Sequence, residues 1–201
     1  MRLARVALVW SALATAVVVP IAAAATSPLL AWRDPVYISA GFAGVVALGL
    51  LLVQPLLMGG YLPELSAHRG RCIHRWIGVL LVVAVVAHVG ALWLTSPPDV
   101  IDALLFASPT PFSAWGVIAM WAVFATALLA ALRRQLRVRL RSWRAGHMVL
   151  AVFIVVGSVI HTILIEGTME TMSKVALCAL VIAVTVKVIA DLRGWAKRWS
   201  R

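Results

Sequence analysis

Four histidines lie inside long apolar stretches of a chain that has only 5 histidines in 201 residues. His74 and His88 bound the run HRWIGVLLVVAVVAH, and His147 and His161 bound the run HMVLAVFIVVGSVIH. A spacing of 14 residues in an α-helix leaves an angular offset of about 40° and a rise of about 21 Å. Each pair therefore shares one helix face, with one imidazole near each end. Imidazoles in such places ligate haem or metal ions, or carry protons.

The elements that carry these histidines must be membrane helices. The chain is 63% hydrophobic and 12% charged, whereas a typical soluble domain is about 25% charged. This composition excludes a water-soluble enzyme, a disordered tail and a disulfide-rich secreted module. Crossing a bilayer takes about 20 apolar helical residues. We therefore predict an all-α integral membrane protein, a bundle of six transmembrane helices near residues 3–25, 36–58, 74–95, 112–132, 145–165 and 173–192.

The net charge of +11 indicates how the chain is oriented in the membrane rather than a nucleic-acid partner, because the basic residues lie mainly on one side. Of the 18 basic residues, 16 fall on one side of the predicted membrane. They lie at the N-terminus, in the second-to-third and fourth-to-fifth connections, near the end of the sixth helix and in the C-terminal tail. The tail contains Arg193, Lys197, Arg198 and Arg201. By the positive-inside rule, both termini are cytoplasmic. We expect a multi-pass protein of the inner (plasma) membrane that contacts lipid and binds no nucleic acid.

The third and fifth predicted helices both run from the cytoplasm to the outside, because a single helix lies between them, and this brings the histidines level in two pairs. His74 and His147 lie near the cytoplasmic face, and His88 and His161 lie near the outer face. A haem iron takes one axial imidazole from each side, and its porphyrin suits an apolar bundle core. We predict two b-type haems between these helices, in a single haem-binding domain over residues 1–201. Zinc or copper fits less well, because no carboxylate or thiolate joins either pair.

Other residues near the histidines are candidates for cofactor contacts. Gly78 and Ala151 each stand four residues after an inner histidine, and their small side chains would leave room for a porphyrin; close helix packing also favours such residues. Arg75 and Arg144, together with Arg71, lie at the depth expected for the propionates of the inner haem. The alternative is that these arginines only enforce the topology.

The paired histidine helices in a six-helix bundle resemble the ferric reductase-like transmembrane domain superfamily, particularly in the HRWIG and WRAGH settings of His74 and His147. This superfamily includes NADPH oxidases, ferric reductases and the haem-binding membrane subunit of the periplasmic methionine sulfoxide reductase system, which is similar in size. The resemblance implies that the four histidines ligate two haems that carry electrons across the membrane. This chain differs from those small haem-binding subunits at His74, because they do not consistently have a histidine at the corresponding position.

We expect no FAD or NADPH site in this chain, because no dinucleotide fingerprint is present and only RGWAKRWSR follows the sixth predicted helix. The predicted function is therefore electron transfer by the haem subunit of a membrane oxidoreductase. A separate flavoprotein or quinol would donate on the cytoplasmic side, and a periplasmic protein or ferric chelate would accept. Alternatives are a quinol-oxidising or superoxide-handling di-haem cytochrome, and a haem-free transporter or assembly factor that uses histidine proton relays.

Three local features complete the prediction. Residues 3–25 are predicted to be a retained helix, with a cleaved signal peptide as the alternative. In the outer connection, DVIDALLFA can form a short amphipathic helix with Asp99 as N-cap, although a plain connector is favoured. Cys72 and Cys178 fall on opposite sides of the bilayer, so we expect no disulfide between them.

Overall fold

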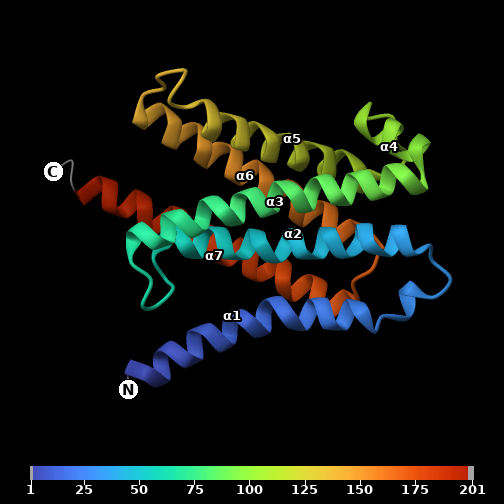
Figure 1. Ribbon diagram of the computed structural model, residues 1–201, viewed down its shortest axis with the longest axis horizontal. Helices are drawn as coiled ribbons and strands as arrows, with labels where there is room; N and C mark the ends of the chain where they lie inside the picture. The colour runs from blue at the N-terminus through green and yellow to red at the C-terminus, as the bar shows by residue number, and fades with distance from the viewer. Residues whose placement is uncertain (1, 199–201) are drawn as a thin grey trace.

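The computed structural model describes residues 2–198, with side chains to residue 192, and this part of the chain is helical without strands (Figure 1). Six helices are long and apolar enough to cross a membrane, which makes this a multi-pass membrane protein. The basic tail residues named above lie outside the described side chains. The helices are α1 (Arg2–Ala25), η1 (Pro28–Leu30), α2 (Pro35–Gly59), α3 (Ala67–Thr95), α4 (Pro97–Leu104), α5 (Pro111–Leu132), α6 (Leu140–Leu164) and α7 (Thr171–Arg198).

The two histidine helices begin earlier than the apolar runs predict. Helix α3 begins at Ala67 rather than near residue 74, because Ser66 caps it by accepting a hydrogen bond from the Arg69 N–H at 3.3 Å. Helix α6 begins at Leu140 rather than near residue 145. The additional turns are polar, and a search for apolar segments does not detect them. His74 and His147 therefore lie about two turns inside their helices.

The outer connection does contain a short helix, α4, but Asp99 is not its N-cap. Ser96 occupies the cap position, and Pro97 and Pro98 form the first two helical positions. Proline suits these positions because the first helical N–H groups have no intrahelical acceptor. Asp99 lies in the first turn, where its carboxylate accepts a hydrogen bond from the Ser96 hydroxyl at 2.5 Å.

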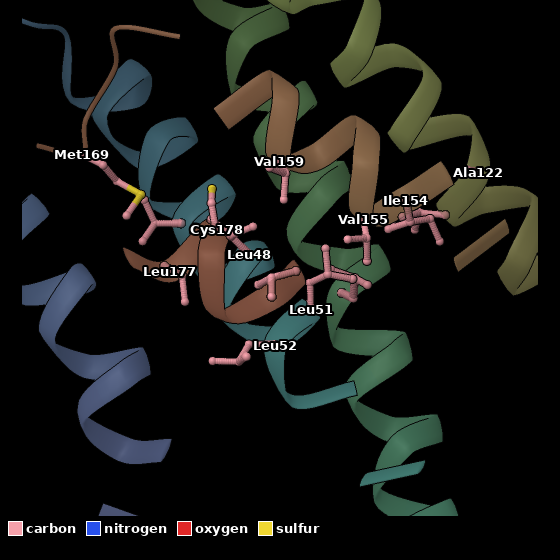
Figure 2. Close-up of a cluster of buried hydrophobic side chains, with 14 of the residues drawn as sticks. Leu48, Leu51, Leu52, Ala122, Ile154, Val155, Val159, Met169, Leu177 and Cys178 are labelled. Atoms are coloured by element: carbon pink, nitrogen blue, oxygen red, sulfur yellow. The ribbon is translucent and has the colours of Figure 1, made fainter. Parts of the chain in front are cut away.

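Packing divides the bundle into two antiparallel hairpins. Helix α2 packs along α3, and α5 packs along α6, whereas the backbones of α3 and α6 have little or no direct contact. Helix α7 packs against α2 and α6 and so joins the hairpins. Figure 2 shows the core at this junction, where buried side chains of the three helices form one cluster: Leu48, Leu51, Leu52, Ile154, Val155, Val159, Leu177 and Cys178. Cys178 and Cys72 are both free.

The two ends of the bundle differ in charge. The start of α1, the α2–α3 and α5–α6 connections and the end of α7 lie together at one end, which we call the basic end (Figure 1). The α1–α2 connection, α4 and the α6–α7 connection lie at the other, which we call the far end (Figure 1). The arginines of the α5–α6 connection therefore share an end with the start of α1 and the end of α7.

Candidate functional site

The four intramembrane histidines face each other in two pairs. At the far end, the ring centroids of His88 and His161 are 6.2 Å apart, with an angle of 82° between the ring planes. At the basic end, the ring centroids of His74 and His147 are 6.1 Å apart, with an angle of 68°. Each pair joins α3 to α6, so the imidazoles meet across the two helices whose backbones stay apart. We call these the far-end pair and the basic-end pair.

Hydrogen bonds fix the tautomers of the far-end pair. Nδ1 of His88 lies 2.7 Å from the carbonyl oxygen of Ala40, and Nδ1 of His161 lies 2.9 Å from the carbonyl oxygen of Phe112. A backbone carbonyl only accepts, so both Nδ1 atoms carry the proton and donate. The lone pair of each neutral ring is then on Nε2. Metal-ligating histidines in proteins are commonly held in this way, with one ring nitrogen donating a hydrogen bond and the other free to bind the metal.

Two glycines allow these imidazoles to reach their carbonyl partners. A Cβ atom on Gly44 would lie 3.2 Å from Nδ1 of His88, and a Cβ atom on Gly116 would lie 2.7 Å from Nδ1 of His161. Each glycine stands four residues after the carbonyl that accepts the hydrogen bond. Each far-end imidazole therefore lies over a bare glycine and bonds to the preceding helical turn.

The basic-end pair has different partners. The side-chain amide of Gln54, on α2, lies between Nδ1 of His74 and the N–H group of Gly78, so either its oxygen or its nitrogen can face Nδ1. Nδ1 of His147 is buried and has no hydrogen-bond partner among the described residues. The His147 ring instead stacks on the indole of Trp143, with centroids 5.2 Å apart and planes 19° apart. The Arg133 guanidinium lies 4.6 Å from the centroid of the Trp143 ring.

The other predicted cofactor contacts are less closely placed. A Cβ atom on Gly78 would lie 3.3 Å from the end of the Gln54 carboxamide, so this glycine gives room to the glutamine side chain. Ala151 is half-buried, and its contact with a porphyrin stays a prediction. Arg75 is exposed beside Cys72, in a shallow surface hollow, and Arg144 is also exposed. Neither arginine forms an ion pair within the described residues, so their pairing with propionates is also still a prediction.

The geometry of both pairs fits a six-coordinate haem iron. An iron bound on opposite sides by two imidazole nitrogens, each at about 2 Å, holds the ring centroids about 6 Å apart. Both observed separations match this value. Within the described residues, no three side chains of His, Cys, Asp or Glu gather where they could hold a metal ion. Each pair thus offers two imidazoles, and the porphyrin of a haem would supply the remaining ligands.

The sequence predicts the two histidine pairs but not the groups that contact their Nδ1 atoms. Gly44, Gly116 and Gln54 lie on α2 and α5, far from the histidines along the chain. The two acceptors at the far end are backbone carbonyls, which no residue type reveals. Gln54 carried a detectable signal, because a carboxamide within an apolar run is as unusual as an imidazole there.

Comparison with known proteins identifies the family. Residues 40–158 match the family model described as "Ferric reductase like transmembrane component". The match runs from α2 into α6, includes His74, His88 and His147, and ends three residues before His161. Searches of curated proteins and of solved structures return no match. More than half of the chain is covered, and the chain therefore belongs to the ferric reductase-like transmembrane family, whose membrane domains serve electron transfer.

Proposed function

We propose that the chain carries electrons across the membrane through two b-type haems, each ligated by one histidine pair. The observation that carries the proposal is the geometry of the far-end pair. Two imidazoles face each other at the separation that an iron requires, and both Nδ1 protons are held by backbone carbonyls. A haem pair would supply one-electron redox chemistry that no side chain near the pairs provides.

The residues of the chain would bind and orient the cofactors. Nε2 of each histidine would bind the haem iron, and the carbonyls of Ala40 and Phe112 would keep the far-end histidines in the required tautomer. The separation of α3 and α6 would accommodate the rings, and apolar helices around them would exclude water. Arg75 and Arg144 would pair with the propionates of the basic-end haem.

The direction of transfer follows from the orientation that the charge distribution predicts. With the basic end in the cytoplasm of the inner (plasma) membrane, electrons would enter at His74 and His147 and leave at His88 and His161. The donor is a separate flavoprotein or quinol, and the acceptor is a periplasmic protein or a ferric chelate. Stopped-flow reduction of the purified chain by a flavoprotein or by quinol distinguishes the two donors.

A reduced-minus-oxidised spectrum with a haem-to-protein ratio tests the proposal. We expect a b-type spectrum and a ratio near two for the full chain purified after expression with adequate haem. H88L and H161L should each lower the ratio toward one, as should H74L and H147L. The matched control is H68L, because His68 is exposed at the start of α3 and should leave the ratio unchanged. Colourless protein would overturn the proposal.

A further inference from the structure

The two hairpins follow one plan at the far end. His88 lies over Gly44 and bonds to the carbonyl of Ala40, and His161 lies over Gly116 and bonds to the carbonyl of Phe112. The spacing between carbonyl and glycine is the same in α2 and α5, as is the spacing between the histidines of α3 and α6. The far-end imidazoles are therefore held in equivalent ways.

At the basic end, the two hairpins differ in the side chain that stands beside the histidine. Ten residues after Gly44, α2 carries Gln54, whose amide meets Nδ1 of His74. Ten residues after Gly116, α5 carries Thr126, whose hydroxyl donates to the carbonyl of Ala122 at 2.7 Å. A threonine that bonds to its own helix offers nothing to the neighbouring one. Nδ1 of His147 is left buried without a partner within the described part of the chain.

The remaining contact of His147 does not replace the missing hydrogen bond. The stack on Trp143 restricts the plane of the imidazole, but an aromatic face at this angle provides no acceptor for Nδ1–H. The indole Nε1 of Trp143 is itself buried without a partner. Gln54 is better suited, because its carboxamide can turn its oxygen toward Nδ1–H of His74, which leaves the lone pair on Nε2 for iron.

This difference changes how strongly each imidazole binds iron. A hydrogen bond from Nδ1–H orients the ring and raises its basicity, and losing such a partner typically weakens metal binding about 10- to 100-fold. A more basic axial imidazole also favours ferric over ferrous iron and so lowers the reduction potential. Three of the four imidazoles have a partner for Nδ1, and His147 has none.

We propose that Gln54 is a positioning residue for His74, and that the lack of an equivalent side chain at Thr126 makes His147 the least constrained of the four ligands. The basic-end haem is consequently the more weakly held of the two and has the higher midpoint potential. This inference rests on the proposed function, since it assumes that both pairs ligate haem.

Supplying and removing the partner tests the inference. T126Q places an amide on α5 at the position that corresponds to Gln54 on α2. The midpoint potential of the basic-end haem should therefore shift down, and this haem should dissociate more slowly, by about tenfold. Q54L should shift the same potential up and speed haem loss. T126V is the matched control, because it removes the hydroxyl without adding an amide, and it should change neither potential. Combining each variant with H88L assigns the remaining haem to the basic end.

The outcomes separate this inference from the function on which it rests. Protein without haem overturns both. Two haems whose potentials are unchanged in T126Q and in Q54L overturn the inference alone, as does a shift confined to the haem that H88L removes. If T126Q does not fold, Q54L still tests the inference, because the midpoint potential that it shifts must be that of the haem that remains in the H88L variant.

Discussion

Gly116 has the tightest contact of the glycines that lie against the histidines. The G116A substitution would place Cβ 2.7 Å from Nδ1 and 3.0 Å from Cε1 of His161, so the imidazole must move off the Phe112 carbonyl. Overpacking of this kind costs about 1–3 kcal/mol. We expect G116A to lose the far-end haem, so that the haem-to-protein ratio falls from about two toward one.

A graded series controls this prediction. G44A should have a milder effect, because its Cβ would lie 3.2 Å from Nδ1 of His88. G90A on α3 should retain both haems, because its Cβ would have no neighbour within 4 Å. Equal haem loss in G90A and G116A would show that the effect is general helix destabilisation rather than displacement of His161.

The sequence predicts which histidines lie in the membrane but not which groups hold them. The four histidines were predictable, because an imidazole in an apolar run is costly and its helical spacing defines a face. Their pairing followed from the number of membrane helices, because the single span between the two histidine helices makes these helices parallel. The partners of Nδ1 were not predictable, because Ala40 and Phe112 contribute carbonyls that every residue has. Which carbonyl an imidazole reaches depends on how α2 packs on α3 and α5 on α6.

Lys174 joins α7 to the end of α6. Its buried ammonium donates to the carbonyls of Ile165 at 3.0 Å and Ile163 at 3.4 Å. These carbonyls follow His161 closely and have no further helical N–H to bond. Charge-assisted hydrogen bonds of this kind contribute about 1.5–3 kcal/mol each. K174M should therefore lower the melting temperature and speed amide hydrogen exchange at residues 161–165.

Lys187 provides the control for this prediction. It lies on the same helix, but its ammonium is exposed and pairs with Asp191 at 3.0 Å. Exposed pairs contribute little to stability, so K187M should leave the melting temperature nearly unchanged. Similar exchange rates at residues 161–165 in K174M and in the unmodified chain would show that Lys174 does not hold the end of α6.

Glu170 caps the start of α7 and makes this helix end sensitive to pH. Its carboxylate accepts from the N–H groups of Met172 at 2.7 Å and Ser173 at 2.6 Å, and these bonds lower its pKa below the usual range. Because the pKa of Glu170 is lower in the folded than in the unfolded state, its carboxylate stabilises the fold at pH values above the pKa of the unfolded state. This stabilisation is lost as the pH falls through the pKa of the folded state. E170Q should therefore melt at a lower temperature than the unmodified chain at neutral pH.

The difference between E170Q and the unmodified chain should shrink as pH falls below the usual range of a glutamate. Thermal unfolding followed by circular dichroism at several pH values measures it. E166Q is the control, since Glu166 is exposed in the same connection and accepts no backbone hydrogen bond within the described structure. A pH-independent difference for E170Q would contradict the capping role.

For the whole molecule, the charge difference between the two ends predicts which end faces the cytoplasm. The start of α1, the end of α7 and the arginines of the α5–α6 connection share the basic end, and lysine and arginine are retained on the cytoplasmic side during insertion. Cys72 lies half-buried near this end, whereas Ala107 is exposed in the α4–α5 connection at the far end. Single thiols at these two positions report on opposite sides of the membrane.

In a C178A background, a membrane-impermeant maleimide should label Cys72 in inside-out vesicles, and C72A/A107C should be labelled in right-side-out vesicles. Removing Cys178 leaves one thiol in each chain, although its side chain is only 2% exposed and reacts poorly in any case. The reverse pattern would place both termini outside and invert the proposed direction of transfer. It would leave the histidine pairs unaffected, because their facing geometry depends on α3 and α6 being parallel and not on which end is cytoplasmic.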